Sequence, residues 1–302
     1  MLDYQEVVAH LDDWRSAGRI AAEALEYGKT LIKPGARAVE VADKIEQKIR
    51  DLGAVPAFPV ILACNHVAAH WVPDPDDALI LEGQVVKLDM GAAVNGAIGD
   101  CAVTVDLSGT WADLCKASLD AVNNVAKELH PGMELGAIGK IIGETIESFG
   151  YKPIRNLSGH GIMPFTIHTW PTVPNFDTGD KTKIVHGMIL ASEPFATDGQ
   201  GSVNEAEECN IFGYLKRRPI RSPITRALVP EVEAFQGMPF TTRWLTKKHP
   251  LVKVNFGLRE MVQTEMIRAY PPLVEAGKGM VSQHERTFFV GDEKVEVLTD
   301  WK

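Results

Sequence analysis

Hydrophobic positions at helical spacing dominate the first half of the chain. Apolar residues recur every three to four positions in four stretches, and Pro34-Gly35 and His130-Pro131-Gly132 interrupt the pattern within each pair. The pattern predicts helices over residues 3–27, 39–52, 111–129 and 135–149. We therefore expect two pairs of amphipathic helices, each packing one apolar face against a sheet.

β-rich runs follow each predicted helix pair. Residues 84–94 and 97–107 are joined by Asn95-Gly96, a strong signal for a two-residue hairpin turn. After the second pair, the sequence predicts a loop-rich region with a tight turn at Gly159-His160-Gly161, and then β-like runs at 183–193 and 210–214. The order helix, helix, strands thus occurs twice, which suggests a duplicated architecture.

The pattern changes again after residue 213. The segment 214–278 predicts helices over 222–235, 241–246 and 255–269, and strands follow at 279–290 and 294–299. We expect an α+β fold in which residues 1–213 and 279–302 form a catalytic domain. Residues 214–278 would then form an inserted helical subdomain.

Charge and composition narrow the class of protein. The 302 residues carry 31 Lys+Arg and 40 Asp+Glu, for a net charge of −9, which argues against a nucleic-acid coat protein. Four cysteines without a CxxC pair argue against a disulfide framework or a zinc knuckle. The sequence has neither a signal-peptide pattern nor an apolar run long enough for a membrane span, so we expect a cytoplasmic protein without membrane contact.

Four acids lie within or directly beside apolar strand-like runs. Asp89 and Asp100 flank the predicted hairpin turn, Glu193 follows Met188-Ile189-Leu190-Ala191, and Glu285 precedes Thr287-Phe288-Phe289-Val290. A buried carboxylate is costly unless it is paired or binds a cation. The alternative interpretation is that the aspartates face solvent and that Glu285 pairs with Arg286 or Lys294.

Together with His160, these acids form a chemically coherent set, although a lone loop histidine is more often an ordinary surface residue. Oxygen ligands with one imidazole suit divalent ions such as Mn, Fe, Co or Zn. Two such ions with bridging carboxylates can activate a water molecule at neutral pH. The pattern therefore indicates hydrolytic chemistry.

The ordered set Asp89, Asp100, His160, Glu193 and Glu285 resembles the metal ligands of the methionine aminopeptidases and their pita-bread relatives. The strings KLDMG, GDCAVTV, GHG, SEPFAT and QHE support the resemblance, as does NHVAAH ending at His70. The 92 positions between Glu193 and Glu285 include the helical segment, which resembles the insertion of the type 2 enzymes, and the start near the catalytic core resembles their archaeal form.

The resemblance implies a fold and a role for each matched residue. The fold would consist of two αα-β halves, related by a pseudo-twofold axis, around a curved and mostly antiparallel sheet, with a winged-helix-like insert. Asp100 and Glu285 would bridge two metal ions (Co, Mn, Fe or Zn), Asp89 would chelate one, and His160 with Glu193 would complete the other. Further implied roles are proton transfer by Glu193, contact with the scissile peptide by His70 and His168, and an apolar methionine pocket at Phe58 and Ile167.

The implied activity is removal of the initiator methionine from nascent proteins, preferably before a small second residue. Two positions depart from the family pattern near this pocket: His66 stands where an acid or amide is usual, and Ile61 where a smaller or polar residue is. The alternatives are a proline-specific aminopeptidase or dipeptidase of the same fold, and a non-catalytic binding protein on this scaffold. The complete ligand set disfavours the second alternative.

The charge is unevenly distributed. Residues 214–278 hold 12 Lys+Arg and 5 Asp+Glu, a net charge of +7, so the rest of the chain is at −16. In the simpler interpretation, these basic residues only form a solvated helical surface. The sharper hypothesis is a transient, salt-sensitive contact with ribosomal RNA near emerging nascent chains, without stable nucleic-acid binding. We expect a monomer.

Overall fold

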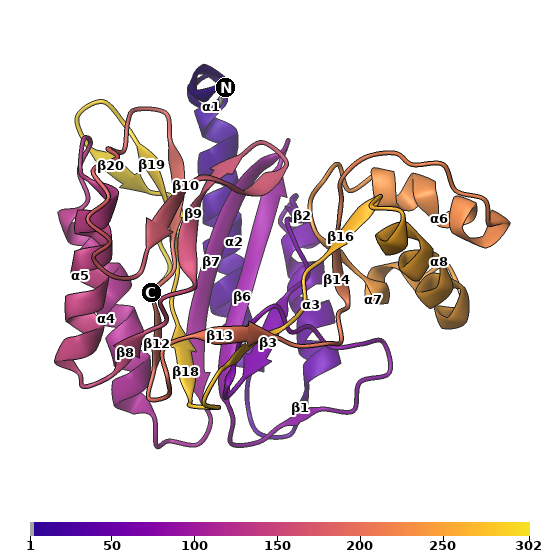
Figure 1. Ribbon diagram of the computed structural model, residues 1–302, viewed down its shortest axis with the longest axis horizontal. Helices are drawn as coiled ribbons and strands as arrows, with labels where there is room; N and C mark the ends of the chain where they lie inside the picture. The colour runs from indigo at the N-terminus through magenta and orange to yellow at the C-terminus, as the bar shows by residue number, and fades with distance from the viewer. Residues whose placement is uncertain (1–2) are drawn as a thin grey trace.

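The computed structural model describes residues 3–302 and places two helix pairs outside a set of antiparallel sheets (Figure 1). The first half of the chain contains these elements: α1 Tyr4–Ala9, α2 Leu11–Leu31, β1 Ala36–Arg37, α3 Ala38–Asp51, β2 Val55–Pro56, β3 Ile61–Cys64, β4 Val67–Ala69, β5 Ile80–Leu81, β6 Val85–Val94 and β7 Ala97–Asp106. The predicted helix over 3–27 is interrupted at His10, whose backbone leaves the helical conformation.

The second half repeats the order of two helices followed by strands. Its elements are α4 Ala112–Glu128, α5 Leu135–Ser148, β8 Lys152–Pro153, β9 Ser158–Met163, β10 Thr166–Pro174, β11 Ile189–Ser192, β12 Phe195–Thr197, β13 Val203–Glu205 and β14 Ile211–Tyr214. The helices α4 and α5 cover this half, whereas α2 and α3 cover the first (Figure 1). The fold is therefore the expected mixed α/β arrangement with antiparallel sheets.

The remaining chain forms a helical lobe and then returns to the sheets. Its elements are α6 Pro223–Glu233, β15 Phe240–Thr241, α7 Thr242–Leu245, α8 Leu251–Gln263, β16 Ile267–Ala269, β17 Leu273–Glu275, β18 Val281–Gln283, β19 Arg286–Val290 and β20 Val295–Val297. The helices α6, α7 and α8 extend to one side of the molecule and enclose a hydrophobic cluster of their own (Figure 1). The last of them begins and ends earlier than the predicted range 255–269, and β16 takes up its expected C-terminal end.

The long hairpin β6–β7 is the centre of the first half, and helix α2 packs closely behind it. A Cβ atom on Gly99 of β7 would lie 2.6 Å from the Cα atom of Gly18 in α2, so both positions require glycine. The hairpin turn has positive φ at both Asn95 (51°) and Gly96 (92°), as a primed two-residue turn requires. The predicted hairpin is confirmed, with every residue from Val85 to Val94 paired to β7.

Residues 158–174 differ from the prediction. In place of a loop-rich region, β9 and β10 form an irregular antiparallel pair, and Gly159-His160-Gly161 lies inside β9. A Cβ atom on Gly159 would lie 2.2 Å from the carbonyl oxygen of Ala191, and one on Gly161 would lie 2.2 Å from that of Trp170. The glycines therefore serve close strand contacts and not a turn.

Among the helices of residues 3–302, none is long and apolar enough to cross a membrane.

Candidate metal centre and active site

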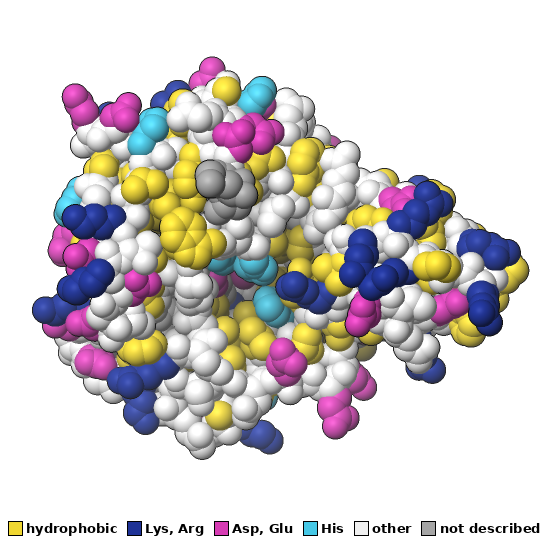
Figure 2. Space-filling model, turned by 45° about the horizontal axis from the view of Figure 1, so that its top comes forward, with side chains coloured by type: hydrophobic (Ala, Val, Ile, Leu, Met, Phe, Trp, Pro, Cys, Tyr) yellow, Lys and Arg dark blue, Asp and Glu magenta, His cyan; other side chains and the backbone are white. Residues whose placement is uncertain are grey.

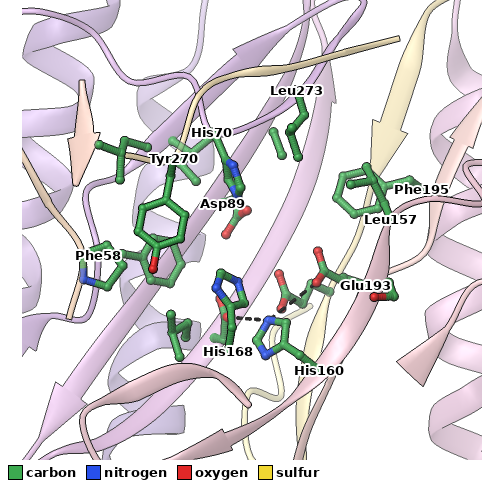
Figure 3. A pocket seen from close by; sticks show the side chains of 18 of the residues that line it. Phe58, His70, Asp89, Leu157, His160, His168, Glu193, Phe195, Tyr270 and Leu273 are labelled. Atoms are coloured by element: carbon green, nitrogen blue, oxygen red, sulfur yellow. Dashed lines mark ion pairs between the residues drawn. The ribbon is translucent and has the colours of Figure 1, made fainter. Parts of the chain in front are cut away.

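The hairpin register brings Asp89 and Asp100 onto one face of the sheet. Gly91 pairs with Asp100, and Asp89 pairs with Ala102 two positions further along. Because side chains alternate faces along a strand, two residues offset by two positions point the same way and are diagonal neighbours. Both aspartates are buried and line the cleft, where Figure 3 shows Asp89.

Glu285 and Glu193 reach the same place from the second half. The N–H group of Glu285 donates to the carbonyl oxygen of Ala102 at 2.9 Å, which fixes Glu285 beside the hairpin. Ser192 pairs with Arg286 across β11 and β19, so Glu193 follows directly next to Glu285. Ligand atoms of Asp100, His160 and Glu285 all lie within 4.8 Å of one another. The two halves of the fold thus meet at the carboxylates.

Burial of these acids strongly favours their neutral forms. Desolvation, its largest cause, raises the pKa of Asp89 to about 7. The pKa values of Asp100, Glu193 and Glu285 are likewise raised well above the ordinary range, by desolvation first and by the charges of the neighbouring acids second. Four carboxyl groups in such a site can all be charged only if cations lie between them. Without cations, protons must neutralise some of the groups.

His160 has the hydrogen bonding of a metal ligand. Its Nδ1 lies 3.1 Å from the carbonyl oxygen of Gly161, an acceptor only, so Nδ1 carries the proton. Desolvation lowers its pKa to about 4, which leaves the ring neutral and Nε2 with a lone pair. That lone pair faces carboxylate oxygens of Asp100 at 3.8 Å and Glu193 at 3.5 Å, the contacts dashed in Figure 3.

The residues present fit a divalent cation. Nε2 of His160 and, once ionised, the carboxylates are all acceptors, and they converge on one place. One oxygen each of Asp89, Asp100 and Glu285 is buried and has no hydrogen-bond partner among residues 3–302. An unpaired buried oxygen is costly, and a hard or borderline cation offsets that cost for all of them together.

Two further histidines stand at the side of the acids. The ring of His168 packs edge-on against His160, with centroids 4.4 Å apart, and His70 lies near Tyr270 (Figure 3). His168 is open to the cleft, yet protein surrounds it closely enough that desolvation lowers its pKa well below the ordinary value. Desolvation also lowers the pKa of His70, whose Nδ1 donates to the carbonyl oxygen of Pro271 at 3.3 Å.

Apolar side chains bound the cleft on both sides of the acids. Phe58 and Tyr270 lie on one side, and Leu157 and Phe195 on the other (Figure 3). The Phe58 side belongs to a hydrophobic cluster with Ile61 and Ile167. The cleft therefore brings together all nine residues singled out from the sequence: Phe58, His70, Asp89, Asp100, His160, Ile167, His168, Glu193 and Glu285.

Several residues that line or support the cleft were not predicted from the sequence. Tyr270 and Leu273 come from the segment that leads back from the helical lobe. Leu157 and Phe195 are close in sequence to the predicted ligands His160 and Glu193, but apolar side chains alone do not indicate a site. Gln283 donates to Asp89 at 3.3 Å, and its spacing of two residues before Glu285 on a strand was the available signal. The departures His66 and Ile61 differ in position, since only Ile61 lines the cleft.

The same fold occurs in several solved structures. A methionine aminopeptidase from Thermotoga maritima matches with a TM-score of 0.71 at 23% identity, over 97% of each chain. A prolidase from Pyrococcus furiosus matches with a TM-score of 0.63 at 20% identity, over 97% of this chain and 64% of that one. A structure described as a thermophilic Arx1 matches with a TM-score of 0.84 at 15% identity, over 98% and 92%. These likenesses define the pita-bread fold.

Sequence comparison gives the family. The model of metallopeptidase family M24 matches residues 12–212. Methionine aminopeptidases from Methanocaldococcus jannaschii and Archaeoglobus fulgidus are 42% and 41% identical over 285 residues, which is 94% of this chain and 96% of each relative. The chain belongs to metallopeptidase family M24 and, within it, to the methionine aminopeptidases. It is a metal-dependent exopeptidase that removes N-terminal methionine, as the resemblance implied.

Proposed function

We propose that the protein works as a type 2 methionine aminopeptidase with two divalent ions, held by Asp89, Asp100, His160, Glu193 and Glu285, in the cytoplasm. The observation that carries this proposal is that carboxylate oxygens of Asp100 and Glu193 lie 3.8 and 3.5 Å from Nε2 of His160, with Glu285 in the same cluster of ligand atoms. Asp100 and Glu285, central in the cluster, would bridge the ions, Asp89 would chelate one, and His160 with Glu193 the other. Co, Mn, Fe and Zn all suit this donor set.

The remaining chemistry is assigned to residues of the chain. Bound divalent ions lower the pKa of a coordinated water and so supply a nucleophile near pH 7. Glu193, at the open side of the acid cluster, accepts the proton of the attacking water and delivers it to the leaving amine. His70 donates through Nδ1 to Pro271, so its Nε2 is an acceptor suited to the N–H group of the scissile peptide.

His168 would stabilise the developing oxyanion. It is open to the cleft and its lowered pKa keeps the ring neutral, so its N–H group donates a hydrogen bond without adding a positive charge beside the cations. Phe58 and Ile167, in one apolar cluster with Ile61, would receive the methionine side chain. The preference for a small second residue is the one that the resemblance implies.

One assay distinguishes this proposal from its alternatives. Purified protein is stripped of metal, reloaded with Mn²⁺, Co²⁺ or Fe²⁺, and offered Met-Ala-Ser and Ala-Pro peptides. Release of methionine only supports the proposal, cleavage only before proline supports a proline-specific peptidase, and no turnover with any ion supports a non-catalytic scaffold. His160→Ala and Glu285→Ala should abolish turnover while the protein stays folded, and near-wild-type activity in either would refute the ligand assignment.

We also propose that residues 214–278 form a basic subdomain inserted into a catalytic domain of residues 1–213 and 279–302. Lys and Arg side chains gather on the helical lobe beside the hollow that contains histidines (Figure 2). The residues that we expect to contact RNA are Lys216, Arg217, Arg218, Lys247 and Lys248. All of them except Lys216 form ion pairs at 3.0–3.7 Å, but exposed ion pairs are weak and leave the positive charge available to RNA. The partner would be ribosomal RNA, contacted transiently by a monomer.

Neutralising five basic residues tests this contact. The variant replaces Lys216, Arg217, Arg218, Lys247 and Lys248 with Gln. We expect it to lose salt-sensitive co-sedimentation with ribosomes while Met-Ala-Ser turnover stays the same. Unchanged co-sedimentation would contradict the contact.

A further inference from the structure

A buried ion pair joins the helical lobe to the first half of the fold. Glu46 of α3 is fully buried, and Arg243 of α7, 197 positions later, is 3% exposed. The guanidinium donates to Oε1 of Glu46 at 2.5 Å and to Oε2 at 3.0 Å, and it also reaches Asp43 at 2.5 Å. Trp244 adds an indole N–H bond to Oε2 of Glu46 at 2.7 Å. We call Glu46, Arg243 and Trp244 the seam cluster.

The seam cluster is better suited to fixing geometry than to adding stability. Burying two charges costs several kcal/mol per ion, and well-packed apolar residues in their place are often as stable or more so. What the pair adds is direction, because a two-pronged guanidinium–carboxylate contact allows only one arrangement of its partners. Both carboxylate oxygens of Glu46 and both terminal nitrogens of Arg243 are paired, whereas Nε of Arg243 has no partner among residues 3–302. A hydrogen-bonded network of this kind fixes how two parts of a protein meet.

On its α3 side, the seam cluster contacts a wall of the cleft. Oε1 of Glu46 also accepts the backbone N–H of Val60 at 3.4 Å. Val60 lies between Phe58 and Ile61, both of which line the cleft. Ile61 in turn pairs with Asp89 across β3 and β6. A shift of Glu46 therefore moves the Phe58–Ile61 wall directly.

On its other side, the seam cluster is close along the chain to a second stretch of the cleft lining, which includes Tyr270 on the same side as Phe58. Arg243 and Trp244 lie two and three positions after the end of β15, which is preceded by the cleft residue Pro239. Strand β15 pairs with β14 at Ile211, and β14 pairs with β16, which leads to Tyr270. Pro239, Ile211 and Tyr270 all line the cleft. The carboxylate of Glu46 thus connects two stretches of the cleft lining that come from distant parts of the chain.

We propose that Glu46, Arg243 and Trp244 are positioning residues that set the width of the apolar end of the cleft and so its selectivity for the methionine side chain. The inference rests on the proposed methionine pocket at Phe58 and Ile167. None of the three lines the cleft, so they act through Val60 on one side and through β15 on the other.

Conservative variants test the proposal. Trp244→Phe removes one N–H donor and keeps a ring against Phe235, and Glu46→Gln keeps the shape but removes the charge. We expect each to raise KM for Met-Ala-Ser about three- to tenfold and to narrow the kcat/KM preference for Met-Ala-Ser over Leu-Ala-Ser by a similar factor, with kcat within about twofold. Bound metal per chain should stay unchanged.

A matched control separates positioning from stability. Thr225→Val removes the Thr225–Glu260 hydrogen bond inside the helical lobe, away from the cleft. It should lower the Tm without moving KM or the Met/Leu preference. Seam variants that change only the Tm, as this control does, would overturn the proposal.

Phe58→Ala separates failure of the inference from failure of the pocket. If Phe58→Ala raises KM and the seam variants do not, the pocket stands and the positioning role is wrong. If Phe58→Ala leaves KM unchanged, the pocket assignment is wrong and the positioning role falls with it. Trp244→Phe is the mildest change and keeps the test open should Glu46→Gln fail to fold.

Discussion

The hydroxyl of Thr287 is hydrogen-bonded to both backbone polar groups of Asp100. It accepts the N–H of Asp100 at 2.9 Å and donates to its carbonyl oxygen at 2.7 Å. Thr287 lies on β19, two positions after Glu285, and Asp100 lies on β7. A single buried side chain therefore connects the two halves of the fold at the two proposed bridging ligands.

Thr287→Val should disturb the metal centre without touching a ligand. It leaves the N–H and carbonyl groups of Asp100 unpaired in a buried site, at a cost of about 1–3 kcal/mol each. We expect metal affinity and kcat/KM to fall by about 10- to 100-fold, as for other residues that orient metal ligands. Mn²⁺ titration and Met-Ala-Ser kinetics measure this. Thr287→Ser keeps the hydroxyl and should restore most of the activity, and an equally impaired Ser variant would contradict the account.

Metal binding should release protons at pH 6. Without ions the pKa of Asp89 is about 7, and those of the other three acids are raised. Acids with raised pKa values favour the folded state while protonated, so the ion-free protein loses this stabilisation as pH rises from about 4 through about 7. Bound ions reverse the trend because they stabilise the charged carboxylates.

Calorimetry in two buffers of different ionisation enthalpy measures the release. The binding heat at pH 6 should depend on the buffer, and the difference in Tm between metal-loaded and metal-free protein should be larger at pH 7.5 than at pH 5. Buffer-independent heats at pH 6 would count against protonated ligands in the ion-free site.

His168→Ala should slow the chemical step and leave the metal centre loaded. If its neutral N–H stabilises the oxyanion, kcat falls by about 10²- to 10³-fold. His186→Ala is a suitable control because His186 does not line the cleft: it is partly exposed, lies 3.3 Å from Asp292 and packs edge-on against Phe289. Kinetics with metal analysis on both variants checks this, and a His168 variant with normal kcat would exclude the role.

Gly91→Ala should impair binding of the methionine side chain. A Cβ atom there would lie 2.7 Å from Cε1 of Phe58 and 3.1 Å from Cβ of Ala57, so the ring must move. We expect KM for Met-Ala-Ser to rise several-fold, with a smaller change in kcat. An unchanged KM would mean that Phe58 does not bind the substrate.

The sequence predicted the acids of the centre because each one breaks an apolar strand pattern and must be explained. The Asn95-Gly96 turn gave the hairpin register, and with it the shared face of Asp89 and Asp100. The strand around His160 was not predicted, because glycines that admit close neighbouring strands look the same in sequence as glycines of a turn.

Other features depend on contacts between distant residues. Tyr270 reaches the cleft only because β16 pairs with β14, and Thr287 finds Asp100 187 positions away. Glu46 reads as an ordinary polar helix residue until Arg243 is placed against it. Local sequence patterns carry no information about such long-range contacts, because tertiary packing determines which distant residues come together.

The most direct test of the metal centre is the Glu285→Gln variant, assayed for bound metal and for methionine release from Met-Ala-Ser. Gln keeps the size of the side chain but cannot bridge cations as a carboxylate does. We expect the folded variant to bind less metal per chain than the wild type and to lose at least about 10³-fold in kcat/KM. A variant that retains its metal and stays within a few-fold of wild-type activity would contradict this expectation.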